Sequence, residues 1–313
     1  MSELLKNIDA RTKLAGTNKL EILMFTLGPD AVTGRRETFG INVFKVREVM
    51  RAPVITRAPE MPDTVVGMVS LRGKLVPIID LAKYACVGDG KTPDIMVVTE
   101  YNGLTQGFLV EAVDTILRLD WAAMRVPPEM LSAKLGGLVT AVTELDDGRL
   151  IMMLDVEKIL AETAQYDNDA LFANIQIKAP ANRTVFFADD SSVARRQITK
   201  TLETINVQHM SAINGFQAWR ELKRIADAAD TSGKQVKDFI QLVLTDVEMP
   251  EMDGYMLTRQ IRADPRFAGI PVIMHSSLSG NSNQQLGQSV GIDEYVSKFE
   301  PHKLAEAVVR LLS

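Results

Sequence analysis

The chain has 313 residues, a length that accommodates two domains. Its hydrophobic share of 46% and charged share of 24% are typical of a globular protein. The net charge of −5 is spread thinly, with 20 basic against 24 acidic residues in 1–178 and 15 against 16 in 179–313. Neither half has the basic excess that binding to a phosphate backbone requires, so we predict no nucleic-acid partner.

A single cysteine, Cys86, excludes an internal disulfide and fits a reducing compartment. The sequence holds no apolar run long enough to cross a membrane, and basic residues interrupt residues 1–20, where an export signal would need an unbroken apolar core. We therefore expect a cytoplasmic protein without direct membrane insertion.

The first part of the chain has the pattern of an all-β domain. Residues 1–19 are weakly amphipathic and predict an N-terminal arm. Residues 20–165 hold many short apolar runs with few helical patterns, which predicts a small β-barrel or sandwich. Glycine-containing turns are expected at Arg72–Gly73, at Asn102–Gly103 and at Asp146–Gly148. Val46, Val49 and Met50 predict one turn of helix, and a closing helix is expected near Val156–Ala164.

The second part changes character. Residues 166–182 lack strong periodicity and predict a linker. Residues 183–313 then alternate strand and helix patterns, five of each. This alternation predicts an α/β fold with a doubly wound, five-stranded parallel sheet covered by helices on both faces.

Asp246 ends the apolar run Phe239–Thr245 and is followed closely by Pro250. The pattern is that of a buried parallel strand with a carboxylate at its carboxyl end. Gly254 provides the chain reversal before the next helix. Ligands of open α/β sheets bind at that edge, so Asp246 is a candidate functional residue.

Other predicted strands also end in reactive side chains. Asp189 and Asp190 end the first, Ser276 ends the fourth, and Lys298 follows the fifth. Doubly wound topology brings these ends together, and crowded carboxylates are tolerated mainly around a divalent cation, for which hard oxygen ligands favour Mg²⁺. A lysine and a serine hydroxyl opposite would suit a phosphoryl group. The set indicates phosphoryl transfer to or from a carboxylate.

Residues 183–313 resemble the response-regulator receiver domain, a flavodoxin-like fold. The motifs that carry the resemblance are Asp189-Asp190, Thr245–Pro250, Asp253-Gly254, Pro271–Ser276 and Tyr295–Lys298. The resemblance implies that Asp246 accepts a phosphoryl group from the phosphohistidine of a histidine kinase. One departure is Phe299, where receivers usually have proline, and it leaves the peptide geometry after Lys298 open.

The resemblance also implies a role for each site residue. Asp190, Asp246 and the backbone carbonyl of Glu248 would bind Mg²⁺ directly, with Asp189 acting mostly through water. Ser276 would hydrogen-bond the phosphoryl oxygens, and Lys298 would pair with them. Tyr295 fits the aromatic position that turns inward when the serine moves.

Residues 20–165 resemble the CheW-type coupling domain of bacterial chemotaxis. The resemblance rests on Phe39–Val49, Val66–Leu81 and Met152–Ile159. Ser70 stands where coupling domains commonly have asparagine. The family consists of paired small β-barrels that bridge methyl-accepting chemoreceptors to the chemotaxis histidine kinase. Arg72, at an expected exposed turn, is the candidate contact residue.

A coupling domain followed by a receiver resembles the CheV-type chemotaxis proteins. The resemblance implies an adaptor at membrane-bound receptor arrays, in which phosphorylation of Asp246 tunes coupling or drains phosphoryl groups. Two alternatives stay open. One is a phosphatase of the haloacid-dehalogenase type with Asp246 as nucleophile, although Glu248 stands where that family has a second aspartate. The other is an unregulated scaffold with a vestigial receiver.

Overall fold

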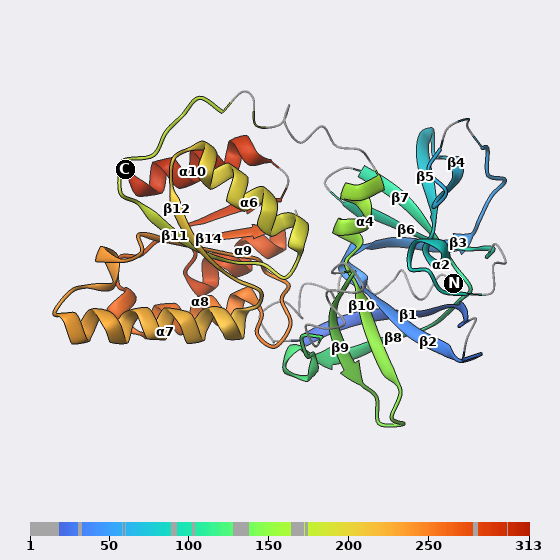
Figure 1. The fold of residues 1–313 in the computed structure, drawn as a ribbon, viewed down its shortest axis with the longest axis horizontal. Coiled ribbons are helices and arrows are strands. Elements are labelled where there is room, and N and C mark those ends of the chain that lie inside the picture. Colours follow the sequence, from blue (N-terminus) through green and yellow to red (C-terminus); the bar gives the residue numbers. More distant parts are fainter. Residues whose placement is uncertain are drawn as a thin grey trace. The chain divides into compact units, whose positions relative to one another are not determined.

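The computed structural model describes residues 19–30, 33–57, 59, 61–88, 93–101, 104–127, 138–163, 172, 175–277, 281–298 and 300–313. From Leu20 on, the described residues form two compact units, one up to residue 165 and the other from residue 166 (Figure 1). Residues 1–18, the Asn102–Gly103 turn and Phe299, each named in a prediction above, lie outside the described residues. No helix in the described ranges is long and apolar enough to span a membrane.

The first unit is built mainly of strands. Its elements are β1 (Lys19–Pro29), β2 (Arg36–Asn42), β3 (Val46–Arg51), β4 (Val65–Leu71), β5 (Lys74–Asp80), α2 (Leu81–Tyr84), β6 (Ile95–Tyr101), β7 (Leu104–Val110), β8 (Ala112–Asp120), β9 (Val139–Glu144), β10 (Leu150–Leu154) and α4 (Val156–Thr163), with short 3-10 helices at Val43–Lys45 and Trp121–Ala123.

The strands of this unit form two five-stranded sheets, in the orders β8-β1-β2-β10-β9 and β3-β6-β7-β5-β4. Most neighbours are antiparallel, and β2 with β10 and β5 with β7 are parallel pairs. Side chains from both sheets, such as Phe25 and Phe108, are fully buried in one shared core. The expectation of an all-β unit made of two small β-structures is therefore confirmed.

The predicted helical turn at Val46 to Met50 is wrong. These residues belong to strand β3, which pairs antiparallel with β6. A register shift between Val46 and Glu48 places apolar residues at helix-like spacing within a strand. The helical residues nearest to this point in the described chain are Val43–Lys45, just upstream.

The second unit alternates strand and helix as predicted. Its elements are β11 (Thr184–Ala188), α6 (Ser192–Thr204), β12 (Gln208–Ala212), α7 (Gly215–Ser232), β13 (Leu242–Thr245), α8 (Gly254–Ala263), β14 (Val272–Ser276), α9 (Asn281–Val290), β15 (Glu294–Ser297) and α10 (Pro301–Leu312), with 3-10 helices η4 (Val236–Asp238) and η5 (Pro265–Phe267).

Its five strands form one parallel sheet in the order β12-β11-β13-β14-β15. Alternate residues of β11 show why both faces need cover. Val185 and Phe187 pack in a core with α6 and α10, whereas Phe186 and Ala188 pack in a core with α7 and α8. A strand buried on both faces reads as a continuous apolar run, which is the pattern from which the sequence predicted a parallel sheet.

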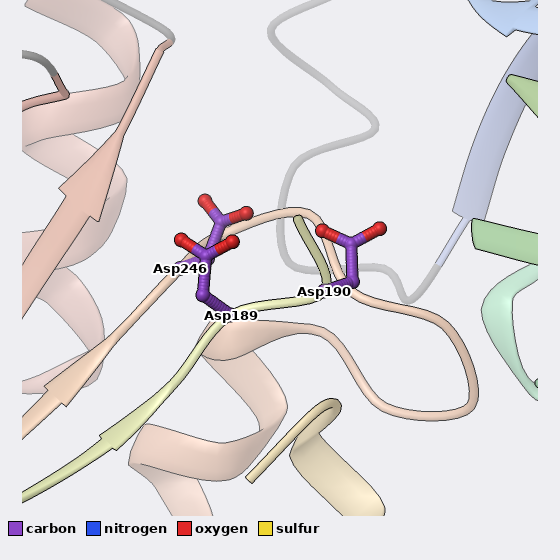
Figure 2. A group of neighbouring side chains, drawn as sticks. All are labelled: Asp189, Asp190 and Asp246. Atoms are coloured by element: carbon purple, nitrogen blue, oxygen red, sulfur yellow. The ribbon is translucent and has the colours of Figure 1, made fainter. Parts of the chain in front are cut away.

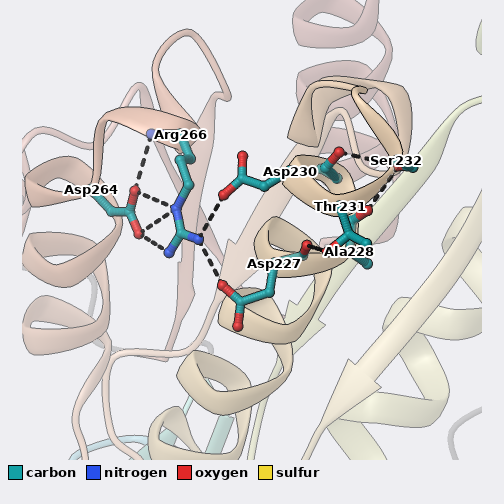
Figure 3. A network of polar contacts seen from close by, with 8 residues as sticks. Asp227, Ala228, Asp230, Thr231, Ser232, Asp264 and Arg266 are labelled. Atoms are coloured by element: carbon teal, nitrogen blue, oxygen red, sulfur yellow. Dashed lines mark hydrogen bonds and ion pairs between the residues drawn. The ribbon is translucent and has the colours of Figure 1, made fainter.

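An ion-pair network joins α7 to the connection that leads into β14 (Figure 3). The Arg266 guanidinium donates to Asp264 at 2.6 Å and to Asp227 at 2.8 Å, and its Nη1 is 3.3 Å from Asp230. The hydrogen bond from the Arg266 side chain holds the pKa of the Asp264 carboxyl below its ordinary value. The network ties the carboxyl half of α7 to η5.

We predict that Arg266→Met lowers the free energy of unfolding by about 1 kcal/mol at pH 7, because a partly exposed network contributes little more than that. A carboxyl with a lowered folded-state pKa contributes stability above its unfolded pKa of about 4 and loses it as pH falls through the folded value. The difference between variant and wild type should therefore shrink below about pH 4. Urea unfolding between pH 7 and pH 3 measures this.

Arg310→Met is the matched control, since it removes an exposed arginine whose ion pair is with Glu294. Its effect should be smaller than that of Arg266→Met. Equal effects of the two variants at pH 7 would contradict a network role for Arg266.

Candidate functional site

Asp246 lies directly after β13, at the carboxyl edge of the parallel sheet. Its backbone N–H donates to the carbonyl of Ala188 at 2.8 Å, which ties the end of β13 to the end of β11. Its carboxylate Oδ1 accepts the N–H of Val247 at 2.7 Å. The side chain is buried and its orientation is fixed by these contacts.

Gly254 is needed because the chain passes close to Asp246. A Cβ at Gly254 would lie 1.9 Å from the Asp246 carbonyl oxygen, so any larger residue would displace the backbone that carries the carboxylate. Asp253, the preceding residue, caps α8 by accepting the N–H of Met256 at 2.7 Å. The Asp-Gly pair thus starts the helix and leaves room for the site.

Asp189, Asp190 and Asp246 come together as predicted from the strand ends (Figure 2). Each offers a carboxylate oxygen, and these oxygens lie within 4.8 Å of one another. Opposite ligands of Mg²⁺, with bonds of about 2.1 Å, are about 4.2 Å apart, so the set fits this ion with small adjustments. All three ligands are hard oxygens, which is the donor type that Mg²⁺ prefers.

Lys298 lies opposite the acids and is only 1% exposed. Its Nζ is 2.8 Å from Oδ2 of Asp246 and 2.9 Å from Oδ2 of Asp189. Burying an ammonium is costly unless it is paired, and here two buried carboxylates pair with it. The three acids and the lysine leave two net negative charges, which one divalent cation would neutralise.

Arg195 was not identified from the sequence. Its Nη1 donates to the backbone carbonyls of Asp189 and Asp190, both at 2.8 Å. It therefore fixes the loop from which two of the three acids project. Arg195 lies in the first turns of α6, where the helix dipole disfavours a cation. This unfavourable position is the feature of the sequence that could have indicated a specific partner for Arg195.

Ser276 ends β14, is fully buried and lies opposite Ser297 in the sheet register. Its side chain hydrogen-bonds that of Tyr295. Burial raises the pKa of Tyr295, and Asp246 and Glu248 raise it further, while the Ser276 hydrogen bond and Lys298 oppose the rise. The serine and the tyrosine are thus linked to each other and to the acids.

Tyr255, on α8, was also missed by the sequence analysis. It is 1% exposed and packs in a small core with Val247, Met274 and Val290, against which Tyr295 also packs. Burial raises the pKa of Tyr255, with further contributions from Tyr295 and nearby carboxylates. Tyr255 therefore helps to support Tyr295. The sequence did not identify it, because an aromatic residue on a helix face is most often an ordinary core residue.

Two further predicted residues are placed as follows. Glu248 follows β13 in the loop that begins at Asp246, and its side chain is buried. Arg72 lies in the β4–β5 turn with φ of +51° and a side chain that is 67% exposed. Its Nη2 pairs with Oε2 of Glu48 on β3 at 2.9 Å. Arg72 is thus on the surface of the first unit, and Glu248 is beside the acids of the second.

We predict that Arg195→Gln weakens Mg²⁺ binding about fivefold, which corresponds to about 1 kcal/mol for hydrogen bonds lost from a charged donor. Titration calorimetry with Mg²⁺ alone measures this. Arg195→Lys should restore part of the affinity, because an ammonium can still reach one carbonyl.

The control is the neighbouring Arg196→Gln, since Arg196 is exposed and, within the described chain, donates to the Ser192 carbonyl over a long 3.4 Å. Its Mg²⁺ affinity should equal that of wild type. If Arg195→Gln and Arg196→Gln bind Mg²⁺ equally well, Arg195 does not position the acids.

Comparison with known proteins identifies both units. Residues 21–164 match the CheW-like domain family, and residues 185–309 match the response regulator receiver domain family. Both resemblances stated from the sequence are confirmed.

Related chains extend the match across both domains. The chain is 31% identical over 280 residues to chemotaxis protein CheV3 of Helicobacter pylori, covering 88% of each chain. It is 28% identical over 336 residues to CheV1 of the same organism, covering 100% of this chain and 99% of that one. It is also 34% identical over 166 residues to CheW of Klebsiella aerogenes, covering 51% of this chain and 94% of CheW. The chain therefore belongs to the CheV family of chemotaxis proteins, which join a CheW-like coupling domain to a response regulator receiver domain.

Proposed function

We propose that this chemotaxis adaptor couples methyl-accepting chemoreceptors to the chemotaxis histidine kinase and is regulated by phosphorylation of Asp246. It would act in the cytoplasm, at membrane-bound receptor arrays. Family membership supports the adaptor role. The observation that supports regulation is the buried contact of Lys298 with Asp189 and Asp246 beside a third carboxylate, which is the charge arrangement a phosphoryl acceptor needs.

The chemistry follows from the placement of these groups. An oxygen of Asp246 would bond to phosphorus as the bond from phosphorus to the imidazole nitrogen of the donor breaks, and the ring would take up a proton. Lys298 would then exchange its contact with Asp246 for one with the phosphoryl oxygens. Ser276 would donate its hydroxyl to another of these oxygens, releasing its hydrogen bond with Tyr295.

Asp189, Asp190, Asp246 and the Glu248 carbonyl would hold Mg²⁺. When bound, the ion supplies positive charge that offsets the charge developing on the phosphoryl oxygens. The fit rests on the three clustered carboxylates and on the two net negative charges that Lys298 leaves uncompensated.

We predict that the full chain gains one phosphoryl group from acetyl phosphate and Mg²⁺, and that Asp246→Asn gains none, because an amide oxygen is a poor nucleophile at phosphorus. Intact-mass spectrometry measures the stoichiometry. Asp230→Asn, an exposed carboxylate of α7, is the control and should be labelled like wild type.

Two results would contradict the proposal. Labelling of Asp246→Asn equal to wild type would remove Asp246 from the acceptor role. Steady turnover of small phosphomonoesters, in place of labelling that stops at one group, would favour the phosphatase alternative.

The β4–β5 hairpin is the proposed contact surface of the coupling domain. Arg72 projects from its turn, and Leu75 beside it is 72% exposed. Leu75 also lines a hollow of about 560 Å³, together with Met68 and Pro77. An exposed arginine beside an exposed apolar side chain and a hollow is a typical composition for a protein contact.

We predict that Arg72→Ala lowers co-sedimentation of the full chain with receptor-containing membranes and the cognate kinase at least about fivefold, as for a contact worth more than 1 kcal/mol. Arg149→Ala is the matched control, because Arg149 is an exposed arginine at another hairpin turn and pairs with Asp147. Equal recruitment of the two variants would exclude Arg72 as a contact.

A further inference from the structure

Part of the segment expected as a linker is packed onto the second unit. Phe172 is 7% exposed and Ile175 is 6% exposed. Both lie in the core formed by α6 and α10 with one face of the sheet, and Ile177 and Ala179 pack against the same core. We call Phe172 and residues 175–179 the strap.

Polar contacts fasten the strap to α6. The Ala179 N–H donates to the carbonyl of Ile205 at 3.0 Å, just past the end of the helix. Lys178 donates to the carbonyl of Thr204, the last residue of α6. Lys200 Nζ lies 4.8 Å from the centroid of the Phe172 ring. A lysine on the last carbonyls of a helix is in the position that the helix dipole favours.

The two helices that share this core both begin at the acid site. α6 begins at Ser192, directly after the Asp189–Asp190 loop, and α10 begins at Pro301, shortly after Lys298. Side chains of α6, such as Leu202, and of α10, such as Val308, share the core that buries Phe172 and Ile175. The strap therefore packs against the two helices that follow the acids and the lysine in the chain.

Phosphorylation of Asp246 would rearrange the contacts at these helix starts. Lys298 now pairs with both Asp189 and Asp246, and a phosphoryl group would take over one of these pairings. Lys298 links these contacts to the start of α10, and Asp189 links them to the start of α6. A change in this pairing would shift one helix relative to the other, and close-packed cores respond to such shifts in discrete steps.

We propose that the strap is the output element of the receiver domain: it is docked when Asp246 is unmodified and loosened when Asp246 is phosphorylated. This inference rests on the proposed function, because it needs Asp246 to be the acceptor. Since the strap lies on the coupling-domain side of the receiver in the chain, its release lengthens the connection between the two domains. Coupling between sites is reciprocal, so loosening the strap must in turn favour the phosphorylated state.

Hydrogen exchange on the full chain tests the proposal directly. The protein is phosphorylated with acetyl phosphate and Mg²⁺, and its phosphoryl content is measured by intact mass. Exchange is then followed at the backbone amides of Ile175 and Ala179, which donate to the carbonyls of Phe172 and Ile205. We expect exchange at least about fivefold faster in the labelled protein, and no change in Asp246→Asn treated identically.

The outcomes separate the two proposals. Stoichiometric labelling with unchanged exchange at Ile175 and Ala179 overturns the strap inference and leaves the proposed function in place. Failure of wild type to accept a phosphoryl group overturns both.

The reciprocal test uses Phe172→Ala with Ile175→Ala and measures the affinity for beryllium trifluoride, a phosphoryl mimic, in the presence of Mg²⁺. We expect the affinity for beryllium trifluoride to rise, at most by the factor by which phosphorylation speeds exchange at Ile175 and Ala179. Ile225→Ala is the matched control, because Ile225 is 7% exposed in the opposite core, with α7 and α8. Should the double variant fail to fold, Lys178→Met removes the contact with Thr204 alone. The inference is overturned if the double variant binds beryllium trifluoride no more tightly than Ile225→Ala does. It is likewise overturned if Lys178→Met binds it no more tightly than wild type does.

Discussion

The contact of Lys298 with Asp189 and Asp246 is the constraint on which the receiver unit depends. A buried ammonium is stable only where carboxylates surround it, and the two carboxylates are stable in burial largely because the lysine is there. With Asp190 added, three carboxylates face one ammonium, so the net charge of the cluster stays negative beside the fixed positive charge of Lys298. These two features are the ones that phosphoryl chemistry at a carboxylate requires.

The surrounding structure also holds this arrangement through the backbone. Gly254 lets α8 start against the carbonyl of Asp246, and Arg195 holds the carbonyls of Asp189 and Asp190. Both act on main-chain atoms beside an acid. Both contacts therefore help to fix where the carboxylates lie.

The adaptor and its regulator are separate compact units joined by one chain, so a signal between them can travel through that connection. The strap makes the receiver larger than its family match at residues 185–309, because Phe172 and Ile175 complete the core against α6 and α10. The proposed strap thus makes part of the interdomain segment a piece of the receiver. The length of chain free to join the two domains then depends on whether the strap is docked.

The sequence alone determined which side chains meet at the acid site. Asp189 and Asp246 each follow a mainly apolar strand, and Lys298 follows the short strand β15. A doubly wound parallel sheet has a single carboxyl edge where the residues after its strands converge. Fold class and family followed from the same local patterns, since strand–helix alternation and turn residues are properties of short stretches.

Only the tertiary structure decided features that lack a local pattern. Val46 to Met50 have apolar spacing that suits a helix, yet pairing with β6 makes them a strand, because backbone hydrogen bonds across a sheet outweigh weak propensity. The Arg195 contacts depend on how the loop before α6 folds back. Phe172 and Ile175 form too short an apolar pair to show periodicity, and their burial was decided by the surface that α6 and α10 present together, which no stretch of sequence contains by itself.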